Sequence, residues 1–161
     1  MAAAPEREAI RRLDWRAATL AGIVAGIVFL MLEMLLVQFF GPMSLWGPPR
    51  MIAAIVMGQG ILPPPDTFDF TALVVAMIIH FPLSIVLAVM LGWIVSRWKL
   101  GLWEALVVGT VFGLAIYAVN FYGFTAVFPW FAEARGWIAI VSHAMFGLVL
   151  GAVYQALERR S

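Results

Sequence analysis

Cysteine is absent from the sequence, and histidine and charged residues are scarce. Without cysteine the chain has no disulfides, no thiolate metal sites and no cysteine nucleophile. Charged residues make up 12% of the 161 residues, about half the share that soluble domains carry. So few charges offer no basic face to nucleic acid, and we predict no nucleic-acid partner.

The usual sequence signatures of catalysis are also missing. The chain contains no GxxxxGK loop followed by Ser or Thr, no GxGxxG, no HExxH and no GxSxG, so nucleotide binding and the common hydrolase mechanisms have no basis in it. Two histidines and one embedded glutamate are a poor supply of ligands for a hydrolytic metal site. We therefore predict that the protein is not an enzyme and has neither a metal site nor another cofactor.

Hydrophobic residues dominate what is present. They make up 64% of the chain, and the mean hydropathy of +1.00 is typical of an integral membrane protein. Four apolar segments are long enough to cross a hydrocarbon core, which needs about 20 helical residues. We predict an all-α bundle of four transmembrane helices that forms one membrane domain over residues 1–161, with spans at about 17–40, 70–95, 102–125 and 137–156.

Basic residues are distributed unevenly across these spans, and this asymmetry predicts the orientation. Eight fall on one side of the predicted membrane: Arg7, Arg11, Arg12, Arg16, Arg97, Lys99, Arg159 and Arg160. Arg50 and Arg135 fall on the other. Because Lys and Arg are enriched in cytoplasmic loops, we predict that both termini are cytoplasmic and that the loop 41–69 lies outside.

Six tryptophans fall near the predicted span ends: Trp15, Trp93, Trp98, Trp103, Trp130 and Trp137. Amphipathic aromatic rings favour the headgroup layer. We predict that these tryptophans anchor the spans at the membrane interfaces.

The first outer loop, residues 41–69, is unusually long for a loop without structure of its own. Its centre, residues 51–57, is apolar but too short to span, and prolines flank it on both sides. This pattern predicts a short interfacial or re-entrant helix. Its role stays open between a lid that covers the bundle and a functional element. Asp66, Thr67 and Asp69 are candidate N-caps for the second span.

The sequence contains an internal repeat. GIVAGIVFLMLE, residues 22–33, aligns with GTVFGLAIYAVN, residues 109–120, and HFPLSIVLAV aligns with HAMFGLVLGA. The alignment pairs Glu33 with Asn120 and His80 with His143. It predicts two tandem helical hairpins. Small-residue pairs that favour close helix packing recur at Gly22/Gly26, Gly109/Gly113 and Gly147/Gly151.

The repeat predicts a polar layer inside the membrane. At about 1.5 Å per helical residue, Glu33 and Asn120 lie late in outward spans, and His80 and His143 lie early in inward spans. All four therefore reach one depth, slightly outside the midplane. Further side chains that could contribute to this layer are Ser84, Tyr117, Ser142 and Gln38. Polar groups at this depth normally face the bundle interior and have a partner.

Two interpretations of the layer stay open. In the structural one, each histidine is a neutral imidazole hydrogen-bonded to a neighbouring helix, and Glu33 is a protonated carboxyl bonded to an imidazole or to Asn120. In the functional one, Glu33 binds a proton or a cation, because embedded carboxylates rarely occur without a role.

The second half of the chain resembles a known family. The order HFPLSIVLAV, then LWEALVVGTVFGL, then NFYGFTAVFPWFAEARGWIAIVSHAMFG, over about residues 80–147, is similar to the YagU-like family of uncharacterised bacterial inner-membrane proteins. The resemblance implies a bacterial inner-membrane location and a four-helix bundle. It implies no particular chemistry.

These observations predict a small, non-enzymatic integral membrane protein. It is either an oligomeric, proton-coupled transport or permeation unit or an accessory subunit of a larger membrane complex, with the lipid bilayer and other copies or subunits as partners. The alternative is an electron-transfer subunit that holds haem b, with His80 and His143 as axial ligands from neighbouring helices. Arg50 and Arg135 would then meet the propionates.

Overall fold

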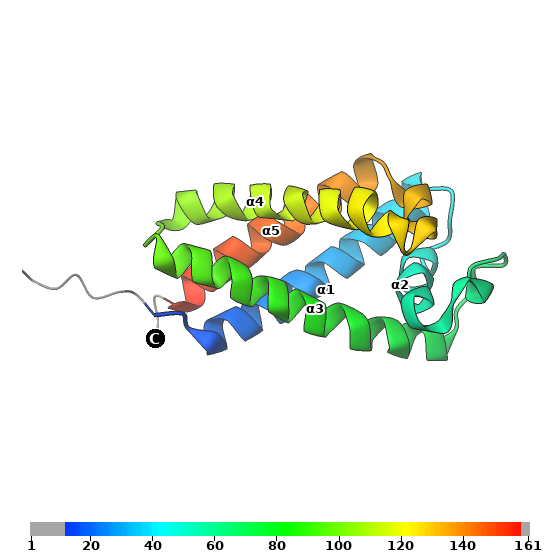
Figure 1. Ribbon diagram of the computed structural model, residues 1–161, viewed down its shortest axis with the longest axis horizontal. Coiled ribbons are helices and arrows are strands. Elements are labelled where there is room, and N and C mark those ends of the chain that lie inside the picture. The colour runs from blue at the N-terminus through cyan, green and yellow to red at the C-terminus, as the bar shows by residue number, and fades with distance from the viewer. Residues whose placement is uncertain (1–11, 159–161) are drawn as a thin grey trace, which may run out of the picture.

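The computed structural model describes residues 12–158, and within this range every regular element is helical. Four helices are long and apolar enough to cross a membrane (Figure 1). They are α1 (Trp15–Phe40), α3 (Phe70–Arg97), α4 (Leu102–Ala118), which the shorter turns prolong, and α5 (Trp137–Glu158). Of the basic residues used to predict the orientation, Arg7, Arg11, Arg159 and Arg160 lie outside the described residues.

The shorter elements gather at one end of the bundle. They are α2 (Gly47–Met57), η1 (Gln59–Ile61), the π-helical turn η2 (Val119–Gly123), η3 (Phe124–Ala126) and η4 (Pro129–Ala134). We call this the α2 end. The opposite end, where α1 begins and α5 ends, is the terminal end (Figure 1). The predicted all-α bundle of four spans is therefore confirmed, and the loop 41–69 contains the predicted short helix.

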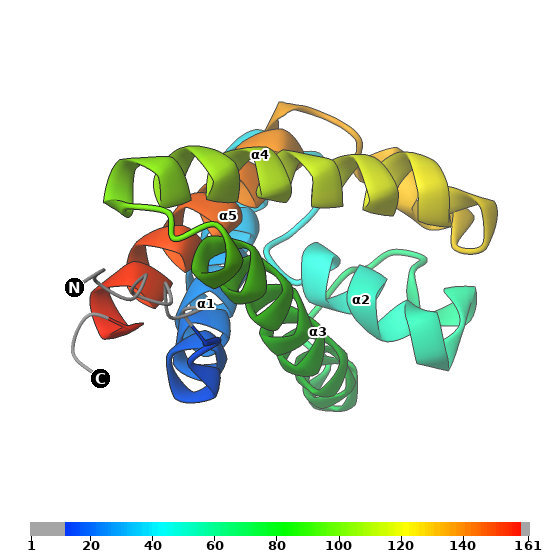
Figure 2. The ribbon, with the colours of Figure 1, turned by 60° about the vertical axis from the view of Figure 1, so that its left-hand side comes forward.

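The four long helices form two hairpins, α1 with α3 and α4 with α5, joined through contacts between α1 and α5. Helices α3 and α4 have little contact, and Figure 2 shows them diverging from the loop that joins them. The bundle is therefore tightly packed at the terminal end and spreads apart toward the α2 end.

Glycines allow the backbones within each hairpin to approach closely. A Cβ added to Gly109 or Gly113 would overlap the carbonyl oxygen of Gly147 or His143 on α5. In the first hairpin, a Cβ on Gly22 would lie 2.8 Å from the Cα of Ile85. These small-residue pairs thus pack helices of the same chain against each other, where van der Waals contact supplies much of the stability.

The terminal end is closed by a dense core and a chain of hydrogen bonds. Leu91 and Leu150 are fully buried, as is Tyr154. The backbone N–H of Asp14 donates to the Tyr154 hydroxyl (3.2 Å), which lies 2.7 Å from Ser96 Oγ. Ser96 in turn donates to Glu158 (3.2 Å). This chain connects the start of α1 with the last turns of α3 and α5.

The predicted N-caps of α3 and the predicted continuous third span are confirmed only in part. Asp69 caps α3, since its carboxylate accepts from the N–H of Ala72 at 3.0 Å. Asp66 has another role: its carboxylate accepts from the N–H of Ser44 at 2.6 Å and holds the start of the loop to its end. Regular α-helix in the third span ends at Ala118 and continues as π and 3-10 turns, which the expected continuous span over 102–125 did not foresee.

Five of the six tryptophans near the span ends are exposed, as interface anchors would be, but Trp130 is not. It is 9% exposed, and its indole N–H donates to the carbonyl of Met51 at 3.1 Å. The anchor interpretation is wrong for this residue, because the indole packs inside the protein and fastens η4 to α2.

Candidate functional site

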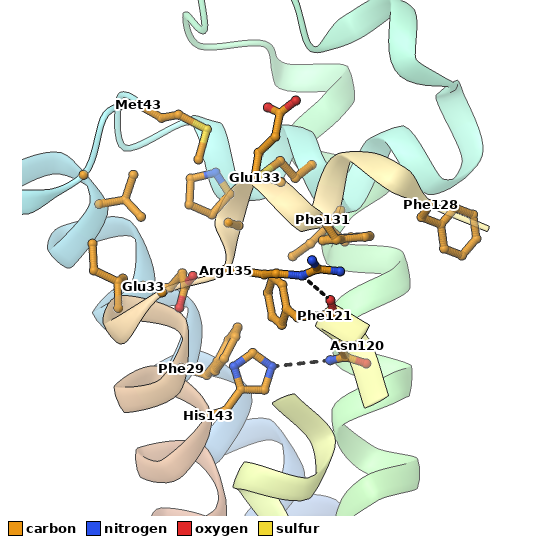
Figure 3. Close-up of a pocket in the computed structure, with 18 of the residues that line it drawn as sticks. Phe29, Glu33, Met43, Asn120, Phe121, Phe128, Phe131, Glu133, Arg135 and His143 are labelled. Atoms are coloured by element: carbon orange, nitrogen blue, oxygen red, sulfur yellow. Dashed lines mark hydrogen bonds between the residues drawn. The ribbon is translucent and has the colours of Figure 1, made fainter. Parts of the chain in front are cut away.

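A cavity of about 470 Å³ opens at the α2 end, between the spread helices. All four residues of the predicted polar layer line it: Glu33 from α1, His80 from α3, Asn120 from η2 and His143 from α5. Figure 3 shows three of them, Glu33, His143 and Asn120, around its deep part. The volume falls within the range of about 300–1,000 Å³ typical of small-molecule sites.

His80 is held across the first hairpin. Its Nε2 lies 2.9 Å from the carbonyl oxygen of Gly26 on α1. A carbonyl only accepts, so Nε2 carries the proton, and in a neutral imidazole Nδ1 is then an acceptor. Gly26 permits this contact, because a Cβ there would lie 3.3 Å from His80 Nε2 and 2.9 Å from Ser84 Oγ.

His143 is held by its own helix and by η2. Its Nδ1 donates to the carbonyl of Ala139, one turn earlier, at 2.8 Å, so the neutral ring accepts at Nε2. Asn120 Nδ2 approaches this Nε2 at 3.4 Å (Figure 3), a long and weak hydrogen bond. The π-helical turn that contains Asn120 is a departure from regular helix of the kind often found at functional sites.

Phe29 of α1 separates the two imidazoles. Its ring stacks on His80 with centroids 5.6 Å apart and meets His143 edge-on at 4.8 Å. Each histidine also donates one ring N–H to a backbone carbonyl, an arrangement that metal-binding histidines share, so these bonds do not decide against ligation. Axial ligation of a haem by this pair would require Phe29 to leave its place against both rings, so the described geometry does not favour the haem alternative.

Glu33 is the least satisfied polar residue of the layer. It is 7% exposed, and its Oε2 has no hydrogen-bond partner among residues 12–158. The Ser142 side chain lies beside the carboxyl group, but its own hydroxyl also lacks a partner of good geometry in this range. Buried polar atoms without partners cost free energy. A carboxyl kept in this state beside a cavity is suited to take up a ligand or a proton.

Two segments that are far apart in the sequence, α2 and η4, line the cavity at its α2 end, and we call them the roof. Met51 and Ala54 of α2 pack in one cluster with Trp130, and Phe128 and Phe131 are among the partly buried residues around it. The Trp130 hydrogen bond to Met51 fastens the two segments together. The predicted short helix in the outer loop therefore forms part of the cavity wall.

Two arginines hold the segments of the roof in place. Arg50 donates to the carbonyl of Ile61 through Nε (2.8 Å) and to that of Thr67 through Nη1 (3.0 Å). Arg135 donates from Nε to the carbonyl of Phe121 at 2.6 Å (Figure 3). Its guanidinium also donates to Thr125 Oγ1 at 3.1 Å and lies over the ring of Tyr122.

The supporting residues named from the sequence lie behind the cavity wall. Ser84 packs against Gly26, Tyr117 against His143, and Ser142 beside Glu33. Gln38 lies elsewhere and accepts from the N–H of Leu45. Sequence reasoning missed the roof and the aromatic walls, because they combine segments that no periodicity connects. The one available signal in the sequence is Trp130 directly after Pro129, away from the charged ends of the chain, and the anchor prediction for it does not lead to the roof.

Metal ligands are not clustered in the part of the chain that the structure describes, where no three His, Asp or Glu side chains come together to hold an ion. Comparisons with protein-family models, with curated proteins and with solved structures found no match for this chain. The resemblance to the YagU-like family therefore stays a prediction, and function must be argued from the cavity.

Proposed function

We propose that the chain is a small membrane transport protein that binds a solute in the cavity at the α2 end and couples it to protonation of Glu33. The observation that carries this proposal is the meeting of Glu33, His80, Asn120 and His143 on one cavity of small-molecule size. Ionisable residues that face such a cavity at membrane depth commonly mark substrate pathways and proton relays.

The bundle is open at one end and closed at the other, and this difference supports a carrier more than an open pore. The cavity is accessible at the α2 end, whereas Leu91, Leu150 and Tyr154 fill the terminal end without solvent exposure. A carrier exposes its site to one side at a time, and in many transporters the site lies near the midplane. We propose that the terminal end faces the cytoplasm of a bacterial inner membrane, so that the cavity opens to the outside.

Four spans enclose little of a pathway, so we propose that two or more copies act together. The glycine pairs already pack helices within the chain. A second copy would therefore contact other surfaces, such as the outer faces of α3 and α4. The accessory-subunit interpretation is the competing proposal, in which the polar layer only stabilises the bundle.

Proton flux in liposomes under an imposed pH gradient tests the coupling. We expect flux with the wild-type protein and its loss in Glu33→Gln, because Gln keeps the shape and hydrogen-bonding groups of the side chain but does not titrate. Thermal unfolding of the same samples in detergent should be unchanged, which separates a lost function from a lost fold.

Glu104→Gln is the matched control. Glu104 lies exposed at the start of α4, where its carboxylate accepts from the N–H of Gly101 at 2.6 Å, and Gln also suits this capping position. This variant should keep full flux. Flux that survives Glu33→Gln would refute the coupling, and absence of flux in the wild type would favour the accessory-subunit interpretation.

A further inference from the structure

The hydrogen-bonding groups around the cavity define what kind of ligand it can satisfy. His80 Nε2 and His143 Nδ1 donate to backbone carbonyls. This leaves His80 Nδ1 and His143 Nε2 as acceptors in neutral rings, the second of which Asn120 approaches only at 3.4 Å. The unpartnered Oε2 of Glu33 is a third acceptor. The polar layer is therefore rich in acceptors.

Two of the donors that line the same cavity already have protein partners, although Arg135 keeps further N–H groups. The Asn120 amide nitrogen points at His143, and Arg135 is bonded to Phe121 and Thr125. The other charged group on the wall, Glu133, is an exposed carboxylate and adds a further acceptor. A ligand that complements this set must bring its own N–H or O–H donors, and a positive charge would pair with the carboxylate of Glu33.

The rest of the wall is apolar and aromatic. Phe29, Phe121 and Phe131 line the cavity together with aliphatic side chains of α2 and α3. The rings of Phe121 and Phe131 meet edge-on, with centroids 6.0 Å apart. Such walls bind an apolar or aromatic body, and ring faces also attract a cation.

The opening of the cavity is apolar too. Leu83 of α3 and Phe124 of η3, which both line the cavity, are about half exposed, and Phe40 is more so. Where this opening lies within the hydrocarbon layer, these side chains contact lipid. A ligand can therefore enter from the membrane, which suits an amphipathic molecule.

We infer that the cavity binds a protonated primary or secondary amine carried on an apolar, aromatic body, with the ammonium group at Glu33 and the body against Phe29 and Phe121. This inference gives a substrate class to the transport site proposed above and rests on that proposal. The ammonium group supplies both the donors that the acceptor layer lacks and the charge that Glu33 complements.

A ligand series tests this inference on the unmodified protein. Isothermal titration is done with protein in nanodiscs of zwitterionic lipid, and empty nanodiscs correct for partition into the bilayer. The probes are phenylbutylamine, its neutral alcohol phenylbutanol, and its trimethylammonium analogue, which is charged but has no N–H donor. We expect the amine to bind about tenfold more tightly than either analogue, since charge and donors both contribute.

Variants locate the bound amine. Glu33→Gln should weaken phenylbutylamine about tenfold or more, whereas Glu104→Gln should leave its affinity unchanged. Equal affinity for the amine and the alcohol would overturn the inference, as would amine binding that Glu33→Gln does not alter. So would the absence of amine binding.

The outcome is separate from that of the flux assay. Flux that depends on Glu33 without amine binding would leave the proton coupling standing and refute the substrate class. Amine binding that depends on Glu33 without flux would support the substrate class and refute the coupling.

Discussion

Tyr154 illustrates how a single hydroxyl can hold three helices together. It is fully buried, and its hydroxyl accepts from the N–H of Asp14 and lies 2.7 Å from Ser96 Oγ. Since Ser96 donates to Glu158, the tyrosine hydrogen is free to point at Ser96. Each of the two hydroxyls in the chain is thus paired once as donor and once as acceptor.

Tyr154→Phe should destabilise the protein by about 1–3 kcal/mol, because the buried Ser96 and the half-buried Asp14 each lose a hydrogen bond while the ring packing stays. Ser96→Ala should have a similar effect through the same chain. The measurement is thermal unfolding in detergent for both single variants and the double variant. We expect the double variant to lose less than the sum of the two, and full additivity would show that the groups act independently.

The two histidines lead to a prediction about the visible absorption spectrum of the purified protein. Phe29 packs against both rings, where it would have to move before one iron could bind both of them. We expect no Soret band from protein purified in mild detergent without added haem. A stoichiometric band that disappears in both His80→Ala and His143→Ala would make the electron-transfer alternative the better proposal.

At the scale of elements, the close contact between α4 and α5 depends on glycines, which have no side chain to separate the two backbones. A Cβ on Gly147 would overlap the carbonyl oxygen of Gly109, whereas a Cβ on Gly136 would meet nothing within 4 Å. We expect Gly147→Ala to lower the unfolding temperature, with an overpacking cost of about 1–3 kcal/mol or more. Gly136→Ala is the control and should be nearly silent. Equal melting of the two variants would contradict the close contact.

The loop that carries α2 should respond to acid through Asp66. The N–H of Ser44, helped by the nearby Arg50 charge, lowers the pKa of this carboxyl below its ordinary value. A carboxyl with a lowered folded-state pKa contributes stability that is complete above the unfolded value of about 3.9 and is lost as the pH falls through the folded value.

We therefore expect hydrogen exchange at residues 42–46 and 62–67 to speed up as the pH falls below about 4, after correction for the intrinsic pH dependence of exchange. Asp66→Asn should exchange faster at neutral pH and lose the pH response. A wild-type response that persists in this variant would assign the effect to another group.

Long apolar runs, glycine pairs and the depth of each residue along its helix were enough to predict the four spans and the layer that holds Glu33 and His143. The end of α4 could not be predicted from the sequence. The π-helical turn there is held by contacts with distant residues, the approach of Asn120 to His143 and the bond from Arg135 to Phe121. The roof depends likewise on a hydrogen bond between residues 79 positions apart, which no local pattern encodes.

At the scale of the whole molecule, the orientation remains to be measured. In the described residues, Arg12, Arg16, Arg97 and Lys99 lie toward the terminal end, and Arg50 and Arg135 toward the α2 end. We expect a periplasm-dependent phosphatase to be inactive when fused to the C-terminus and active when inserted at Gly60, in the exposed loop after α2. The reverse pattern would overturn the orientation and place the cavity on the cytoplasmic side.

The hollow α2 end also changes how the membrane potential falls across the protein. When water fills the cavity, it carries little of the voltage drop, so the electric field concentrates over the packed half between Glu33 and the terminal end. A unit charge that crosses the whole potential gains about 2.3 kcal/mol per 100 mV. A proton that passes between Glu33 and the terminal side would therefore gain more of this energy than its path length suggests. Voltage would then act on that step and hardly on the uptake of a proton from the cavity.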